Sequence, residues 1–278
     1  MSPTRRILSG AILIGLLGYT VWAVWPYVWT AMMSLRTTEE ILRDYYGLPI
    51  PAHWDKFAEA WTRFGFGNYL RNSILVTLGA IVIVTAVGSM AAYAFGRPRY
   101  AFRGRELLFG VIFISIMFPP QIMLLALFQL LAKYGLINTR LGLILAYVGA
   151  ELPFTIYLLR AFFAQIPGEI EDAARVDGCG EWVVFSRIMI PIAWPALTTT
   201  IILNFILFWN EFTYAVVLIT EQKARTLPLA VMFLQGETFV DVGMLATGMM
   251  ISTIPVIVLY VFLSEWFVKG MTMGAVKG

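Results

Sequence analysis

The sequence predicts an all-α membrane protein with six transmembrane helices, because its composition is apolar, its charges are few and they leave six long apolar stretches between them. Of the 278 residues, 59% are hydrophobic and 13% are charged, whereas soluble domains have about 45–50% and about 25%. The mean hydropathy is +0.77. This much apolar surface exceeds what one soluble core can bury, which predicts an exterior that faces lipid.

The first three apolar stretches contain no charged residue. A helix needs about 20 mainly apolar residues to cross about 30 Å of hydrocarbon, and these stretches, which are long enough, run over residues 7–35, 72–96 and 107–132. The first follows two arginines, as a secretory signal does, but it is too long and lacks a small-residue cleavage pattern. We therefore expect a retained helix there.

Of the other three stretches, two contain one acidic residue each, but all three still predict spans. Residues 141–159 contain Glu151, residues 188–220 contain Glu211, and residues 242–264 contain no charge. The sequence shows no internal repeat or flexible linker, so we expect one transmembrane domain over residues 1–278. Its spans are expected at about 8–33, 71–96, 107–132, 141–163, 191–219 and 243–267.

Positive charge concentrates between the second and third predicted spans. Four arginines lie within residues 97–105, and short loops rich in Lys and Arg stay in the cytoplasm. The segment 36–71 has as many basic residues, but five acidic residues dilute them. With six spans, the arginine loop predicts that both termini are cytoplasmic.

Several function classes are excluded by composition and motifs. A net charge of +3 is too small and scattered for nucleic-acid binding. One Cys and one His leave no disulfide framework and no His-cluster metal site. The sequence contains neither G-x-x-x-x-G-K-[ST] nor G-x-G-x-x-G. We therefore expect no catalytic residues, no metal and no cofactor, and no ATP hydrolysis by this chain alone.

The most informative segment is residues 165–195, which reads as two short helices around a glycine. Pro167-Gly168 and the acidic residues after it predict a helix start. Gly178 follows at the position where a helix end needs a left-handed backbone. The second helix is expected from about 180 to 190, ending before Pro191.

One face of the first short helix is small and apolar. Ile170, Ala173, Ala174 and Val176 lie roughly on it, and the two alanines would allow a partner surface to approach closely. A DNA-binding helix pair is disfavoured, because residues 169–187 contain five acids and two bases. A connector resting on the bilayer would be rich in Lys and Arg. Docking on a cytoplasmic partner protein fits this loop better.

The loop resembles a known sequence motif. Asp172-Ala173-Ala174, then Gly178, then Ile188-Met189-Ile190-Pro191 matches the spacing of the EAA loop of ABC importer permeases, E-A-A-x3-G-x9-I-x-L-P, with Asp for Glu and Ile for Leu. Further segments resemble the carbohydrate-uptake branch of that family, in particular the smaller permease of maltose-type systems. These segments are NYLRNSILV (68–76), the run 153–178, FWNEF (208–212) and GAVKG (274–278).

The resemblance implies the assembly and the role of the loop. Such a chain is an inner-membrane component of bacteria or archaea that pairs with a second, different permease subunit, with two ATP-binding subunits that hold ATP and Mg, and with an extracytoplasmic solute-binding protein. The loop at about 165–190, here called the coupling loop, would place its first helix in a cleft of the ATPase subunit. The implied ATPase-coupling residues are Glu171, Asp172, Ala173, Ala174, Asp177 and Gly178. The solute would be a sugar or a sugar-like small molecule.

A few polar residues inside the predicted spans are candidates for the solute path. Ionised Glu151, near the middle of span four, would cost about 2.5–3.5 kcal/mol in lipid and should face the bundle interior. Asn204, Asn210 and Glu211 in span five could bind a sugar hydroxyl, as could Gln121 and Gln129 in span three. The alternative for each is a hydrogen bond between helices that only holds the bundle together.

Two other function classes stay open at this point. A secondary carrier or channel that works without an ATPase would explain the spans and Glu151, but it explains neither the acidic helix-glycine-helix loop nor the absence of an evident inverted repeat. A membrane-embedded enzyme is disfavoured because no nucleophile or metal constellation is present.

Overall fold

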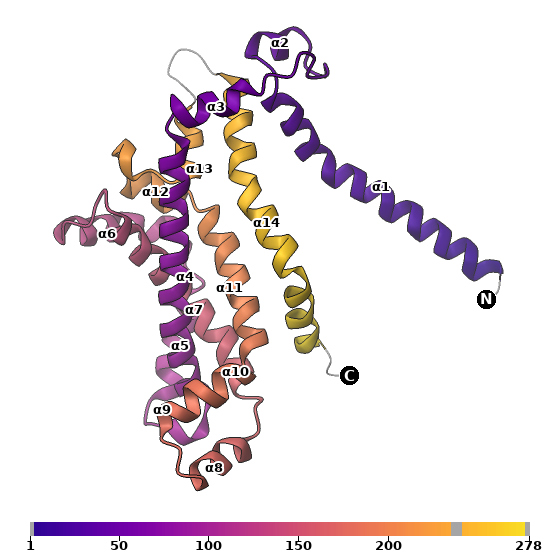
Figure 1. Ribbon diagram of the computed structural model, residues 1–278. Coiled ribbons are helices and arrows are strands. Elements are labelled where there is room, and N and C mark those ends of the chain that lie inside the picture. Colours follow the sequence, from indigo (N-terminus) through magenta and orange to yellow (C-terminus); the bar gives the residue numbers. More distant parts are fainter. Residues whose placement is uncertain (1–2, 235–240, 276–278) are drawn as a thin grey trace. The chain divides into compact units, whose positions relative to one another are not determined.

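The computed structural model describes residues 3–234 and 241–275, with side chains for residues 8–234 and 241–262. These residues form helices and contain no strand. Figure 1 labels these helices. They group into two compact units. Unit 1 is Met1–Gly67 with Ala230–Ile254, and unit 2 is Asn68–Leu229 with Pro255–Gly278. The terminal motif at 274–278 lies largely outside the described residues.

Four of the six predicted spans are continuous helices that are long and apolar enough to cross a membrane. The structure thus confirms helices in the first, second, fourth and sixth predicted stretches. Three of them contain an internal proline, Pro26, Pro153 or Pro255, and continue through it. The four helices are α1 (Pro3–Ser34), α4 (Phe66–Gly96), α7 (Arg140–Phe163) and α14 (Val242–Ala275).

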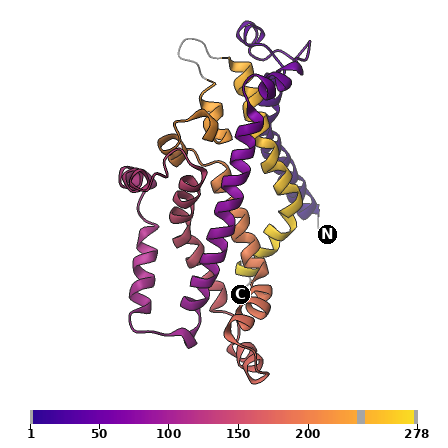
Figure 2. The same ribbon diagram turned by 60° about the vertical axis from the view of Figure 1, so that its left-hand side comes forward.

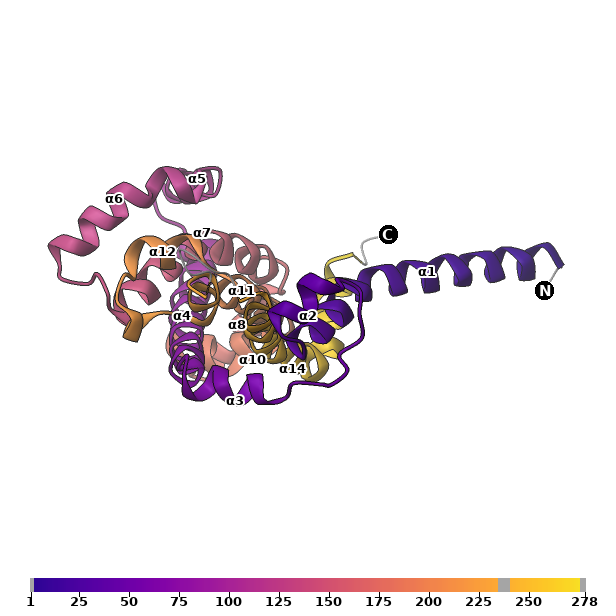
Figure 3. The same cartoon turned by 90° about the horizontal axis from the view of Figure 1, so that it is seen from above.

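The third predicted span is not a continuous helix, so that prediction is wrong in detail. It consists of α5 (Arg105–Ser115) and α6 (Pro120–Lys133), which meet at 102°. Seen from above, the two helices point in clearly different directions (Figure 3). The cause is Pro119-Pro120: Pro119 has an extended backbone (φ −59°, ψ 134°), and Pro120 begins a new helix.

The fifth predicted span, at about 191–219, is also interrupted, and the second helix of the coupling loop does not end before Pro191 as predicted. Glu181–Ile192 and Trp194–Trp209 meet at 74°. Before the proline, the π-helical turn has wider hydrogen bonding, in which the Ile190 N–H donates to Phe185 O. The bend therefore comes at Ala193. The elements are α9 (Glu181–Val183), η2 (Val184–Met189), α10 (Ile190–Ile192) and α11 (Trp194–Trp209).

Short helices fill the connections. In α2, Thr37 and Glu40 form a reciprocal capping box that fixes the helix start. The remaining short elements are α2 (Thr38–Arg43) and α3 (Asp55–Thr62) in unit 1, η1 (Pro98–Tyr100), α8 (Gly168–Val176), α12 (Thr213–Leu218) and η3 (Gln222–Ala224) in unit 2, and α13 (Leu227–Met232).

A buried ammonium holds unit 1 together. Lys56 donates to Arg36 O at 2.9 Å and lies 3.5 Å from the carboxylate of Asp241, which also accepts from the Thr38 hydroxyl at 2.7 Å. A Cβ on Gly243 would come within 2.0 Å of Lys56 Nζ and 2.3 Å of Arg36 O. Only glycine fits there.

An apolar cluster of unit 2 packs α8, through Ala174, against α4, α7 and the helices that follow Gly178. Figure 2 shows α8 at the end of unit 2 from which α4 and α7 extend. An apolar cluster there contains Ala92, Tyr93, Leu159, Phe163, Ile166, Ala174, Val184, Phe185, Met189, Ala193, Ala196 and Leu197. The coupling loop is therefore packed on its own chain.

Candidate functional site

The first helix of the coupling loop and its glycine end lie where the sequence predicts them. Pro167 precedes α8, and Gly178 follows it with φ +83°. A Cβ on Gly178 would meet nothing within 4 Å. The left-handed backbone alone therefore requires glycine here.

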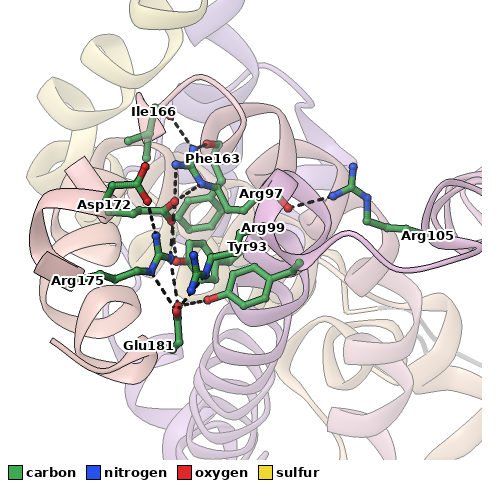
Figure 4. Close-up of polar contacts among 11 residues, drawn as sticks. Tyr93, Arg97, Arg99, Arg105, Phe163, Ile166, Asp172, Arg175 and Glu181 are labelled. Atoms are coloured by element: carbon green, nitrogen blue, oxygen red, sulfur yellow. Dashed lines mark hydrogen bonds and ion pairs between the residues drawn. The ribbon is translucent and has the colours of Figure 1, made fainter. Parts of the chain in front are cut away.

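Glu171 points into the protein. It is 3% exposed, and its carboxylate accepts hydrogen bonds from Arg97 Nε at 2.9 Å, Arg97 Nη2 at 2.6 Å and the Tyr93 hydroxyl at 2.6 Å. Tyr93 lies on α4 and Arg97 directly after it, and Figure 4 labels both side chains near the coupling-loop residues Asp172 and Arg175. This burial places Glu171, one of the expected coupling residues, against its own chain.

The same arginine holds the end of α7. Arg97 Nη1 donates to Phe163 O at 3.0 Å and to Ile166 O at 2.6 Å, two carbonyls at and just after the last residue of α7. Arg105 in turn donates to Arg97 O at 3.0 Å. Arg97 thus joins α4, α7 and α8, and we call this cluster of Tyr93, Arg97 and Glu171 the clamp.

A second, more exposed set of charges lies across the glycine turn. Arg175 donates to both carboxylate oxygens of Glu181, at 3.0 and 3.1 Å, and to Asp172 at 3.1 Å. Glu181 also accepts from the Tyr100 hydroxyl and pairs with Arg99 at 3.2 Å. Burial and the hydrogen bond to Glu181 raise the pKa of Tyr100, so its hydroxyl keeps its proton and donates.

The outer face of α8 is defined here as Ile170, Ala173 and Val176. Ile170 is 37% exposed, Val176 is 87% exposed and Ala173 is exposed. Exposed acids, Glu169, Asp172 and Asp177, flank this face. Ala174 does not belong to it, contrary to the expected four-residue face, because it lies three positions after Glu171 and packs in the core at 7% exposure.

Two of the four predicted path residues meet at a pair of adjoining cavities in unit 2. Glu151 lines a cavity of 660 Å³ among α5, α6, α7 and α11, and a smaller one of 120 Å³ that Glu211 also lines. Glu211 accepts from the N–H groups of Tyr214 and Ala215, at 2.7 and 3.2 Å. Among the described lining residues there is no Lys or Arg.

The two predicted asparagines line neither cavity. Asn204 is 1% exposed and donates to the Thr155 hydroxyl at 3.1 Å, so it joins α11 to α7 and fits the alternative of a bundle-holding hydrogen bond. Asn210 is exposed and donates to Ile206 O in its own helix at 2.8 Å. The exposed side chains of Gln121 and Gln129 lie on α6 outside the cavity lining.

Sequence reasoning missed the clamp. It used Arg97 only for membrane orientation and gave Tyr93 no role. The two clamp ends are 74 residues apart in the chain, and no periodicity or spacing connects them. A buried partner for Glu171 could have been inferred only from its place on the same side of α8 as Ala174.

Comparison with known families decides what kind of protein this is. Residues 85–273 match the family described as binding-protein-dependent transport system inner membrane component. The chain belongs to this family. It is therefore a multi-pass membrane permease subunit of an ATP-driven, binding-protein-dependent importer and not an enzyme, which decides against the secondary carrier and the channel.

Relatives of this permease match over nearly its whole length. It is 36% identical over 277 residues to the trehalose transport system permease protein SugB of Mycobacterium tuberculosis, with 99% of both chains covered. It is 33% identical over 280 residues to the diacetylchitobiose uptake system permease protein NgcG of Streptomyces coelicolor, covering 99% of this chain and 91% of the relative.

Solved structures share its fold. A chain of a bacterial ABC transporter involved in the import of the acidic polysaccharide alginate superposes with a TM-score of 0.83 at 24% identity, covering 96% of this permease and 99% of that chain. A chain of the alginate transporter in complex with its alginate pentasaccharide-bound periplasmic protein gives a TM-score of 0.67 at 14% identity, over 92% of each.

Proposed function

We propose that this permease imports a sugar or sugar-like solute as one of two different permease subunits. Two ATP-binding subunits would drive it, and an extracytoplasmic binding protein would deliver the solute. Support for a sugar comes from the relatives at 36% and 33% identity, whose names give trehalose and diacetylchitobiose as their solutes. ATP and Mg would be bound by the ATP-binding subunits, since this sequence has no phosphate-cradling loop.

The coupling loop and both termini would lie in the cytoplasm. The arginine loop at 97–105 supports this by the positive-inside rule. The hydrogen bonds between Arg97 and Glu171 support it further, because they bring the arginine loop and the coupling loop to the same end of unit 2. An ATP-binding subunit could reach α8 only from that side.

The observation that carries the coupling role is that one side of α8 packs against its own chain while the opposite side exposes apolar side chains. Glu171 and Ala174 fix it to its own chain, so Ile170, Ala173 and Val176 stay available for a partner. The flanking acids Asp172 and Asp177 suit a cleft with a basic rim. We propose that this outer face of α8 docks in the ATP-binding subunit, and that Gly178 lets the chain turn away behind it.

Glu151 and Glu211 are proposed to line the solute path. A carboxylate inside a span needs water, a cation or a hydrogen-bond donor, and sugar hydroxyls are donors. Glu151 lines a cavity whose 660 Å³ volume is in the range of small-ligand sites.

The docking proposal can be tested with one charge placed on the outer face. Val176→Glu changes a side chain that is 87% exposed, so the chain should fold and insert normally. We expect loss of most ATP-binding subunit on co-purification and loss of trehalose or diacetylchitobiose uptake. Gln165→Glu, which adds the same charge at an exposed position before α8, is the matched control and should behave as wild type. Full recovery and uptake with Val176→Glu would contradict the docking role.

A further inference from the structure

The buried pair of Arg97 and Glu171 needs an explanation other than stability. Their side chains are 4% and 5% exposed. The desolvation of two buried charges offsets most or all of their mutual attraction, and an apolar pair of similar size often does as well. A buried pair in this position points instead to a geometric role.

The geometry of the arginine supplies that role. All three nitrogens of its guanidinium are used: Nε and Nη2 hold Glu171 on α8, and Nη1 holds Phe163 O and Ile166 O at the end of α7. The group is planar and its N–H directions are fixed, so these partners are held in one arrangement. A lysine, with a single ammonium, could not hold them all.

The helices that the clamp joins are also in close contact beside it. A Cβ on Gly96, the last residue of α4, would lie 3.1 Å from Arg160 O and 3.2 Å from Phe163 Cβ on α7. This leaves little room for α4 and α7 to slide past each other. The same helix α7 carries Glu151 to the cavity.

We infer that Arg97 is a positioning residue that makes α8, the end of α4 and the end of α7 move as one body. A displacement of α8 by the ATP-binding subunit then reaches the cavity through α7. This inference rests on the proposed docking of α8. It assigns Glu171, the residue before the EAA-type motif, to transmission inside the permease, and leaves contact with the partner to the outer face.

The movement can be measured directly in the assembled importer. With Cys179 replaced by Ala, spin labels are placed at Glu169→Cys on α8, which is exposed and lies outside the outer face, and at Met90→Cys on α4, which is 50% exposed. The distance between them is compared without nucleotide and with ATP trapped. One-body motion keeps it constant within about 2 Å, whereas a change of about 5 Å, one helical turn, would overturn the inference.

A double variant tests the consequence for transport. Arg97→Gln with Glu171→Gln leaves no buried charge unpaired, so the importer should still assemble and hydrolyse ATP. We expect uptake of trehalose or diacetylchitobiose per ATP hydrolysed to fall at least about fivefold. Arg99→Gln, which removes a charge that is 56% exposed in the same region, should keep the wild-type ratio.

The outcomes separate this inference from the proposed function. A double variant with the wild-type ratio of uptake to hydrolysis overturns the role of the clamp and leaves docking intact. If the double variant does not assemble, the label distance in the otherwise unchanged importer still decides. Failure of the unaltered permease to co-purify with ATP-binding subunits would instead overturn docking and this inference together.

Discussion

The coupling loop and the cavity of unit 2 both contain carboxylates, but their surroundings differ. In the loop, Glu171 pairs with Arg97, and Glu181 pairs with Arg175. In the cavity, Glu151 has no hydrogen-bond or charge partner within the described part of the chain, and no cation lines the wall. Unit 2 thus contains both carboxylates paired with arginine and a carboxylate without a described partner.

This difference distinguishes carboxylates that hold the structure together from a carboxylate that is available to a transported solute. A paired carboxylate has its hydrogen bonds satisfied and holds neighbouring elements together. An unpaired carboxylate inside a span is costly unless water or a ligand supplies donors. Glu211 lies between these cases, because backbone N–H groups satisfy part of its carboxylate.

The largest expected effect comes from breaking the clamp. Arg97→Ala removes both guanidinium hydrogen bonds to the buried Glu171 carboxylate and leaves only Arg175, 4.0 Å away, as its cation, which should lower the free energy of unfolding by about 3 kcal/mol, the lower end for a broken buried pair. Thermal unfolding of the purified importer in detergent would measure this. Arg99→Ala, whose partner is exposed, should change it by no more than about 0.5 kcal/mol. Equal effects of the two substitutions would remove the distinction between buried and exposed pairs.

Removing the unpaired charge should affect transport rather than folding. Glu151→Gln keeps the size of the side chain but weakens its hydrogen bonds to solute hydroxyls, and bonds to charged groups contribute about 1.5–3 kcal/mol. Solute uptake should fall by about tenfold or more, while thermal stability is unchanged or higher. Asn204→Ala should do the opposite and lower stability by about 0.6 kcal/mol. A Glu151→Gln importer with normal uptake and lowered stability would make Glu151 a structural residue.

The intermediate case predicts a smaller effect. Glu211→Ala removes the acceptor for two N–H groups at the start of α12, which should cost about 1 kcal/mol, as the loss of a helix cap does. Glu211→Gln keeps an acceptor oxygen and should cost less. Denaturant unfolding of the two variants measures the difference. If Glu211→Ala and Glu211→Gln lower the free energy of unfolding equally, the N–H contacts contribute little to stability.

The smallest effect is expected from pH acting on unit 1. Burial would raise the pKa of Asp241, but the Met244 N–H, the Thr38 hydroxyl and the Lys56 ammonium together lower it below its usual 3.8. A depressed folded pKa gives stability that is present above the unfolded value and is lost as the pH falls below it. The unfolding temperature of wild type should therefore be lower at pH 3 than at pH 5, and this decrease should be smaller in Asp241→Asn. An equal decrease in wild type and in Asp241→Asn would show that Asp241 does not contribute to the pH dependence of stability.

The sequence by itself determined the features that depend on neighbouring residues. The length of each apolar stretch sets whether a helix can cross a bilayer, and in the described part of the chain four of the six predicted stretches are continuous helices, while each of the other two coincides with a bent helix pair. The left-handed turn at Gly178 follows in the same way from a local backbone requirement. The motif spacing placed α8 between the fourth and fifth spans.

Only the tertiary structure decided how distant residues meet and where the helices break. The pairing of Glu171 with Arg97 joins positions 74 residues apart, and it places an expected coupling residue inside its own chain. It also moved Ala174 from the outer face to the core. The breaks at Pro119-Pro120 and Ala193 depend on packing as well, since Pro153 and Pro255 lie in helices that continue. Burial is a property of the whole fold, so a one-dimensional pattern can propose a face of a helix, but packing decides which side chains occupy it.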